Sequence, residues 1–287
     1  MTSVLTLVGQ PGQPLDESLF ARLSGLATVE RQREQIGKGV AEFFYAADDL
    51  AGLRAKAAEN LDGQPVDFCI KTAVPEGHWK LLIADMDSTM ITVECIDELG
   101  DFAGKRDAVV AITERAMRGE IDFEGALRER VALMRGLPES ALPDCFAERV
   151  ELSPGARELV QGCRAAGMHC ALVSGGFTFF TERVAELCGF HENRANRLLI
   201  EGGKLTGTVA EPVLGRQSKI EALDELCARL GISADQAVCI GDGANDIGMI
   251  EKAGLGVAYR AKPITKNAAD CAIDHGGLDV LLRYLGI

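Results

Sequence analysis

Two acidic residues follow directly after a short apolar run. The run 81–84, LLIA, has the composition of a buried strand in a parallel sheet, and Asp85 and Asp87 come next, with Thr89 shortly after them. Two carboxylates a few ångströms apart repel each other, and a divalent cation such as Mg²⁺, which prefers oxygen ligands, removes that repulsion. We therefore expect Asp85 and Asp87 to hold a metal ion. The alternative is that they only cap or turn the chain.

A second acidic turn lies far along the chain, in the segment GDGAND at 241–246, after the apolar run 237–240. Asp242 can supply another carboxylate ligand, and the glycines on either side of it let the backbone turn sharply. The presence of two such turns favours a shared metal site over two unrelated surface turns. We predict that Asp85, Asp87 and Asp242 bind the metal.

Two further clusters have the chemistry to bind an anion. Lys219 lies in the first turn of a predicted amphipathic helix, where a lysine opposes the helix dipole, and this unfavourable position indicates a bound anion. Ser174, Gly175 and Gly176 follow the apolar run 168–173 and offer a hydroxyl and backbone N–H groups to phosphate oxygens. Taken singly, both signals are weak, because surface lysines are usually solvated and Ser-Gly-Gly is common in ordinary turns.

The elements that must position these clusters alternate between strand and helix from residue 81 onward. This alternation predicts an α/β fold with a doubly wound parallel sheet, in which ligands lie outside the carboxyl ends of the strands. The four clusters occupy such places, three after strands and one at a helix start. Residues 94–152 have a helical pattern throughout, which we interpret as a helical cap inserted after the first strand of the sheet.

The first seventy residues have a different pattern. We predict strands at 3–8, 28–35, 39–46 and 65–71, and helices at 15–25 and 48–59. Gly37-Lys38-Gly39 would turn the hairpin, and Asp48 would cap the second helix. This β-α-β-β-α-β order is ferredoxin-like and resembles the ACT modules that bind amino acids, although an accessory domain without a ligand fits equally well. We predict an ACT-like α+β domain at 1–74, through which a homodimer could form, and a second domain at 75–287, with 72–80 as the linker.

Composition excludes some classes of partner. The net charge of −13 and the pI of about 4.9 disfavour binding to nucleic acid or to an anionic membrane. The chain lacks both an apolar run of the ~20 residues that span a bilayer and a signal-like N-terminus, so we expect a cytoplasmic protein. Its 9 cysteines include no C-x-x-C pair, which favours reduced, buried thiols over disulfides or a zinc site.

The four clusters, in this order and spacing, resemble the motifs of the haloacid dehalogenase-like (HAD) phosphatases, from residue 81 to the end. Within that superfamily, the phosphoserine phosphatases are the most similar, through DMDSTMITVECIDELG, FEGALRERVALMRGLP, VSGGF, ANRL and GDGANDIGMI. The resemblance implies Mg²⁺-dependent hydrolysis of O-phospho-L-serine to L-serine and phosphate, the last step of serine biosynthesis. The same motifs fit transfer of the phosphoryl group to homoserine, or another small-metabolite phosphatase. A catalytically silent amino-acid sensor is a third reading, disfavoured because the acidic residues and the lysine are all retained.

The resemblance also implies a role for each matching residue. Asp85 would be the nucleophile that forms an aspartyl-phosphate, and Asp87 would donate and later accept a proton. Mg²⁺ would be held by the Asp85 carboxylate, the Asp87 main-chain carbonyl and Asp242. Ser174 and Lys219 would stabilise the transferring phosphoryl group. The remaining residues implied around the phosphate and the metal are Thr89, Gly175, Gly176, Asn245 and Asp246.

Substrate selection would lie in the cap. Phosphoserine carries an ammonium and a carboxylate, and Glu94 and Arg130 match the family residues that receive them. Arg128 points elsewhere on the same helix and is the weaker candidate. Met117 and Phe123 would form apolar walls. Taken without the motifs around them, Glu94 and Arg130 would be read as part of a solvated helix face.

Overall fold

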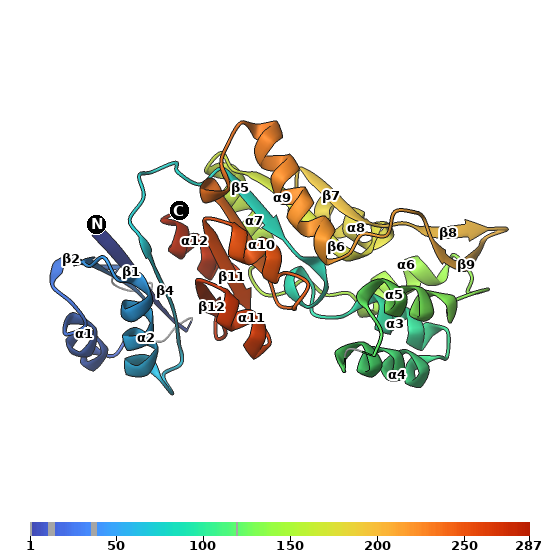
Figure 1. Ribbon diagram of the computed structural model, residues 1–287, viewed down its shortest axis with the longest axis horizontal. Coiled ribbons are helices and arrows are strands. Elements are labelled where there is room, and N and C mark those ends of the chain that lie inside the picture. Colours follow the sequence, from blue (N-terminus) through green and yellow to red (C-terminus); the bar gives the residue numbers. More distant parts are fainter. Residues whose placement is uncertain (1, 11–14, 36–38, 119) are drawn as a thin grey trace.

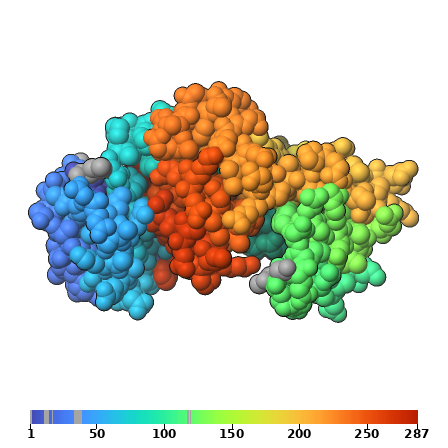
Figure 2. All heavy atoms as spheres, viewed as in Figure 1, coloured from blue at the N-terminus to red at the C-terminus, as the bar shows by residue number. Residues whose placement is uncertain are grey.

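A computed structural model describes residues 2–10, 15–35, 39–118 and 120–287. An N-terminal unit and a helical cap lie at opposite ends of the molecule, with a central sheet and its helices between them (Figure 1). The space-filling view shows the same three parts as consecutive masses (Figure 2). Among the described residues, no helix is both long and apolar enough to cross a membrane.

The N-terminal unit has the predicted β-α-β-β-α-β order. Its elements are β1 (Thr2–Gly9), α1 (Glu17–Ser24), β2 (Val29–Gln35), β3 (Val40–Ala46), α2 (Leu50–Leu61) and β4 (Val66–Thr72). The strands pair antiparallel in the order β2-β3-β1-β4. The predicted cap Asp48 is wrong: the helix begins at Leu50, and the carboxylate of Asp49, one residue after the predicted cap, accepts the N–H of Gly52. Gly37 and Lys38 of the predicted turn lie outside the described residues.

Alternation along these strands separates the two faces of the N-terminal sheet. One face packs on α1 and α2 through Leu5, Phe43, Tyr45 and Ile70, and the Tyr45 hydroxyl donates to the Leu23 carbonyl at 2.9 Å. Since successive side chains point to opposite faces, Val4 and the other residues between these core positions belong to the second face.

The N-terminal sheet continues into the central sheet. Phe68 of β4 pairs antiparallel with Ala272 of β12 (Cys271–Ile273), so ten of the described strands form one sheet. After β2-β3-β1-β4 its order continues with β12, β11 (Leu255–Tyr259), β10 (Ala237–Gly241), β5 (Leu81–Ala84), β6 (His169–Phe177) and β7 (Glu192–Asn196). Next to this junction, the buried Asp67 carboxylate accepts the N–H groups of residues 274–276 at 2.7, 3.1 and 2.7 Å. This carboxylate therefore clamps the N-terminal unit to the loop that follows β12.

The central part has the parallel, doubly wound order that the sequence predicted. Its other strands are β5 (Leu81–Ala84), β6 (His169–Phe177), β7 (Glu192–Asn196), β10 (Ala237–Gly241) and β11 (Leu255–Tyr259). Its helices are α7 (Ala156–Ala165), α8 (Thr178–Cys188), α9 (Arg216–Leu230), α10 (Ile247–Lys252), α11 (Pro263–Ala268) and α12 (Val280–Leu285), with a short turn η2 (Ala234–Gln236). Strand β6 runs on to Phe177, past its predicted end at residue 173.

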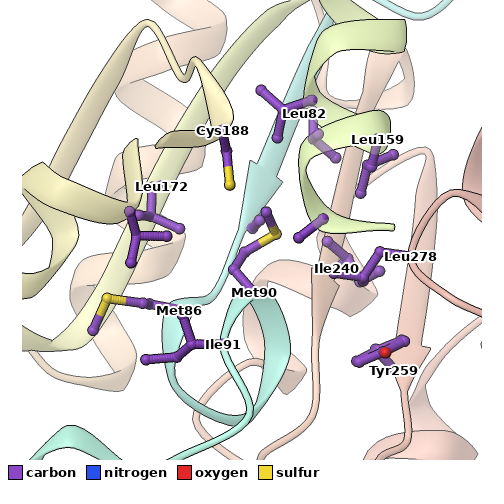
Figure 3. Close-up of a cluster of buried hydrophobic side chains, with 14 of the residues drawn as sticks. Leu82, Met86, Met90, Ile91, Leu159, Leu172, Cys188, Ile240, Tyr259 and Leu278 are labelled. Atoms are coloured by element: carbon purple, nitrogen blue, oxygen red, sulfur yellow. The ribbon is translucent and has the colours of Figure 1, made fainter. Parts of the chain in front are cut away.

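Helices cover both faces of the central sheet. On one face, Leu82, Leu172 and Ile240 of neighbouring strands meet Leu159 of α7 and Cys188 of α8 (Figure 3). On the other face, α9 and α10 cover the alternate residues of the same strands. All nine cysteines lie among the described residues and are buried and free, so their predicted burial is confirmed.

The cap contains the predicted helices and one element that the sequence analysis did not identify. The helices are α3 (Cys95–Phe102), α4 (Arg106–Met117), α5 (Phe123–Ala132) and α6 (Ala141–Arg149). The hairpin β8 (Leu198–Glu201) and β9 (Lys204–Val209) lies beside α5 and α6 (Figure 1). The N–H of Gly136 donates to the Leu205 carbonyl at 2.8 Å, and the Leu205 N–H donates to the Leu137 carbonyl at 2.9 Å. A second chain segment therefore completes the cap.

Candidate active site

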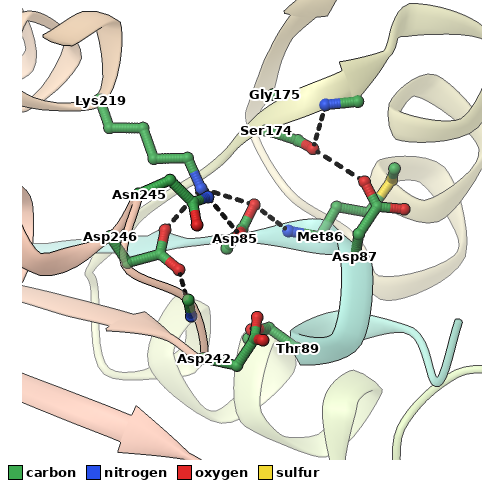
Figure 4. A network of polar contacts seen from close by, with 12 residues as sticks. Asp85, Met86, Asp87, Thr89, Ser174, Gly175, Lys219, Asp242, Asn245 and Asp246 are labelled. Carbon is green, nitrogen blue, oxygen red and sulfur yellow. Dashed lines mark hydrogen bonds and ion pairs between the residues drawn. The ribbon is translucent and has the colours of Figure 1, made fainter. Parts of the chain in front are cut away.

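Three carboxylates from two strand ends meet at the carboxyl edge of the central sheet (Figure 4). Asp85 follows β5, Asp242 and Asp246 follow β10, and these two strands pair in parallel. One carboxyl oxygen of each residue lies within 4.8 Å of the others. Asp85 and Asp246 are buried and Asp242 is half-buried. The two acidic turns that lie far apart in the sequence are thus brought to one point.

This donor set fits a hard divalent cation. All the ligand atoms are carboxylate oxygens, which magnesium and calcium prefer. Burial, with the charge of Asp85 adding to it, raises the pKa of Asp242 to about 7 and that of Asp246 to about 7. Such crowding of negative charge is relieved by a bound cation. The cluster of three carboxylates consists of Asp85, Asp242 and Asp246. The sequence had instead predicted Asp85, Asp242 and Asp87 as metal ligands, with Asp87 binding through its main-chain oxygen.

Lys219 is the cation at the centre of this cluster. It lies in the first turn of α9, is only 1% exposed, and its Nζ is 2.7 Å from Asp85 Oδ1 and 2.5 Å from Asp246 Oδ1. Burial lowers the pKa of the lysine, but the two carboxylates outweigh that effect and hold its pKa above the usual value. The sequence predicted a bound anion beside Lys219 because of its unfavourable helix position. In the structure, the anions beside it are the carboxylates of Asp85 and Asp246.

Asp87 faces a different side of the site. The chain turns tightly over Met86–Met90, with Ser88 at a φ of 56°. The Asp87 carboxylate accepts the N–H of Cys95 at 2.9 Å and the hydroxyl of Ser174 at 3.3 Å. Burial raises the pKa of Asp87 to about 8, with smaller contributions from the negative charges of Glu94 and Asp85. In this environment the carboxyl group holds a proton near neutral pH.

The Ser-Gly-Gly segment lies beside Asp87. The Ser174 hydroxyl oxygen accepts the N–H of Gly176 at 2.8 Å, and a Cβ atom at Gly176 would lie 2.5 Å from Asp87 Oδ2. Only glycine permits this close approach of the backbone to the carboxylate. The buried Asn196 fixes the backbone of Gly175. Its amide nitrogen donates to the Gly175 carbonyl at 2.8 Å and to the Leu214 carbonyl at 3.0 Å.

Asn196 is a residue whose place the sequence analysis did not foresee. It belongs to the quoted motif ANRL, but its contacts are with segments distant in the sequence. Through Gly175 and Leu214 it ties the Ser-Gly-Gly segment to the loop that leads into α9 and Lys219. Of the other predicted residues, Thr89 donates to Asp242 Oδ1 at 3.1 Å, and Asn245 donates to Asp85 Oδ2 at 3.4 Å.

The cap meets the core through Phe123. Its ring lies so close to Gly175 and Gly215 that a Cβ atom at these positions would be 2.8 and 3.0 Å from it. The predicted apolar wall is therefore in contact with the Ser-Gly-Gly segment. Glu94 accepts a hydrogen bond from the Ser88 hydroxyl at 2.8 Å. Met117 ends α4, and its side chain lies outside the described part of the structure.

The two candidate arginines differ in their surroundings. The Arg130 side chain is 14% exposed, and its contacts are long: Nε donates to the Ala126 carbonyl at 3.3 Å, and Nη1 lies 3.4 Å from the Thr113 hydroxyl and 4.0 Å from Asp97 Oδ1. Burial lowers the pKa of Arg130, which the charges of Asp97 and Glu94 oppose. Arg128 is exposed and pairs with Glu124 and Glu211. Arg130 is the arginine with free hydrogen-bonding capacity near Glu94.

A doubly wound sheet with these clusters at its carboxyl edge defines the class of protein. The family model of the haloacid dehalogenase-like hydrolases matches residues 82–251, and the chain belongs to this family. The phosphoserine phosphatase of Albidiferax ferrireducens is 48% identical over 210 residues, which cover 71% of this chain and 89% of that protein. These findings confirm the resemblance that the motifs indicated.

Solved structures extend the likeness to the fold. A HAD family hydrolase from Salmonella enterica covers 99% of this chain and 98% of its own, with a TM-score of 0.85 and 27% identity. A phospho-aspartyl intermediate analogue of phosphoserine phosphatase covers 72% of this chain and 98% of its own, with a TM-score of 0.67 and 40% identity. The first of these likenesses includes the N-terminal unit.

Proposed function

We propose that this hydrolase acts on O-phospho-L-serine and releases L-serine and phosphate, as the last step of serine biosynthesis. The observation that carries the proposal is the meeting of Asp85, Asp242 and Asp246 with Lys219, below a cap that presents Arg130. The 48% identity to a curated phosphoserine phosphatase supports the choice of substrate.

We propose Mg²⁺ as the metal, with the Asp85 and Asp242 carboxylates and the Asp87 main-chain oxygen as its ligands. The all-oxygen donor set supports this choice. When bound, the ion offsets the negative charge that would repel an attacking carboxylate from a phosphate. Asp246, which pairs with Lys219, holds that lysine in place beside Asp85.

The hydrogen bonds of Asp85 suggest which of its oxygens attacks. Oδ1 accepts the Met86 N–H at 2.8 Å and lies 2.7 Å from the Lys219 Nζ, whereas Oδ2 accepts, from the described residues, only a long hydrogen bond from Asn245 at 3.4 Å. Oδ2 therefore forms the bond to phosphorus while the bond from phosphorus to the serine oxygen breaks. Asp87 gives its proton to that leaving oxygen. It then takes a proton from the water that attacks phosphorus, which restores the Asp85 carboxylate and releases phosphate.

Fixed hydrogen-bond donors stabilise the phosphoryl group during both steps. Lys219 contacts Asp85, and the Ser174 hydroxyl contacts Asp87 (Figure 4). Because they are held before the substrate arrives, they need little reorganisation as charge develops on the phosphoryl oxygens. The backbone N–H of Gly175 contributes in the same way, and the Gly176 N–H acts through Ser174, whose hydroxyl oxygen it holds at 2.8 Å.

The cap selects the amino-acid part of the substrate. Arg130 binds the carboxylate through its planar guanidinium, and Glu94 receives the ammonium. Phe123 excludes water from the reacting end. The side-chain roles of Glu94 and Arg130 are supported by their opposite charges and by the unused donors of Arg130.

The N-terminal unit, residues 1–74, is in our proposal an accessory ACT-like domain, through which two chains associate. Its strand order β2-β3-β1-β4, with both helices on one face, supports the ACT-like fold. The nine free thiols support work in a reducing compartment such as the cytoplasm.

The decisive test measures phosphate release by the full chain from O-phospho-L-serine, with Mg²⁺ and after treatment with EDTA. We expect release that EDTA abolishes, and loss of release in Asp85→Asn. The matched control is Asp224→Asn, which changes an exposed aspartate on α9 that pairs with Lys252. An added homoserine arm separates hydrolysis from transfer, since transfer would form phosphohomoserine. Full activity in Asp85→Asn, or equal rates on all phosphomonoesters, would contradict the proposal.

A further inference from the structure

A cavity of about 480 Å³ lies at the end of the molecule away from the cap. The second face of the N-terminal sheet forms its floor, and the connecting segment 73–77, Trp79 and the end of α12 form its walls. Its volume lies within the range of roughly 300–1,000 Å³ that is typical of small-molecule sites. None of the residues that carry the proposed reaction lines it.

Four residues form a continuous row across the floor of this cavity. Arg31 of β2 pairs with Phe44 of β3, Phe44 with Val4 of β1, and Val4 with Lys71 of β4. Cross-strand partners point to the same face of a sheet, so two cations stand at the ends of an apolar strip. The Arg31 guanidinium lies 4.0 Å from the centre of the Phe44 ring.

Lys71 is a half-buried cation without a close anionic partner. Among the described residues it forms no ion pair, and its Nζ lies 5.8 Å from the centre of the Trp79 ring. Burial lowers the pKa of Lys71, which the charge of the nearby Glu42 partly opposes. A desolvated ammonium group without a bound anion is unfavourable, and a ligand with a negative charge would satisfy it.

Trp79 supplies an aromatic ring to the wall of the cavity. The side chain is 6% exposed, and its buried Nε1 has no hydrogen-bond partner among the described residues. Because this atom is buried, a molecule in the cavity would contact the indole ring of Trp79 and not its N–H. Val74, Pro75 and Leu285 make the remaining wall apolar.

We propose that this cavity binds a small organic acid that carries one carboxylate on an apolar body. The carboxylate meets Lys71, with Arg31 at the opposite end of the floor, and the apolar body lies on Phe44 and Val4. Glu42 and Glu76 also line the cavity and repel a second negative charge, which disfavours phosphate and dicarboxylates. The cavity is independent of the proposed phosphatase site.

The experiment uses Trp79 as its own reporter, because it is the only tryptophan of the chain. The full-length protein is titrated with phenylacetate while its tryptophan emission is recorded, and phenylacetamide and inorganic phosphate serve as probes that lack either the charge or the apolar body. We expect a saturable change in emission with phenylacetate and none with the other two. A response that does not saturate, or equal responses to phenylacetate and phenylacetamide, would overturn the proposal.

Two variants test the cations without removing the reporter. Lys71→Met should weaken the binding of phenylacetate at least tenfold, and Arg31→Gln, on the exposed end of the floor, should weaken it severalfold. The matched control Lys56→Met, on the helix-covered side of the sheet, should leave it unchanged. If Lys71→Met fails to fold, Arg31→Gln decides the question. Unchanged binding in the cavity variants that fold would refute the assignment.

Discussion

The role proposed for Arg130 can be tested by removing its charge with Arg130→Met. Its side chain is 14% exposed, and its contacts in the structure are long, 3.3 Å from Nε to the Ala126 carbonyl, 3.4 Å from Nη1 to the Thr113 hydroxyl and 4.0 Å from Nη1 to Asp97 Oδ1. A substrate carboxylate therefore displaces few existing bonds when it binds. Two hydrogen bonds between charged groups contribute at least about 3 kcal/mol together.

That free energy converts to a fold-change in rate. Since about 1.4 kcal/mol corresponds to a factor of ten, Arg130→Met should lower kcat/KM for O-phospho-L-serine by ~10². The assay compares this substrate with phosphoethanolamine, which has the ammonium but lacks the carboxylate. On phosphoethanolamine the variant and the original protein should differ by less than about threefold.

The matched control is Arg128→Met, two residues away on the same helix. Arg128 is exposed and pairs with Glu124 and Glu211, so its loss should change either rate by less than threefold. Equal losses on both substrates in Arg130→Met would show that Arg130 supports the cap and does not bind the carboxylate. A loss in Arg128→Met as large as that in Arg130→Met would refute the geometric distinction between the two arginines.

Three further predictions follow from the buried charges. Lys219→Met leaves two buried carboxylates unpaired and should lower the free energy of unfolding, measured in urea titrations, by about 3–5 kcal/mol. The exposed control Lys252→Met should lower it by under about 1 kcal/mol, and similar values for both variants would contradict this prediction. Asp67→Ala should speed hydrogen exchange at the amides of residues 274–276, and unchanged protection would show that the clamp is dispensable. Mg²⁺ should raise the Tm of the protein, because it binds preferentially to the folded state, and Asp242→Asn should reduce that rise. An equal rise in the original protein and the variant would mean that the ion does not bind at Asp242.

The local sequence determined the elements and the order of the chemical clusters. An apolar run followed by Asp85 and Asp87 reads as a strand end, because such a run cannot accommodate carboxylates in its buried part. The strand and helix order of the N-terminal unit, and the helices of the cap, follow from periodicity within short windows. The N-cap of α2 was misplaced by one residue, since Asp48 and Asp49 are equally good caps on composition and only the helix geometry distinguishes them.

Only the tertiary structure decided which distant groups meet. The parallel pairing of β5 with β10 brings the second acidic turn to Asp85, and the position of α9 makes Asp246 and Lys219 a buried ion pair. The hairpin β8–β9 joins the cap, and Asn196 links two segments, through contacts between residues far apart in the chain. Such pairings depend on the packing of whole elements against one another, and no short window of sequence records which surfaces will be buried together.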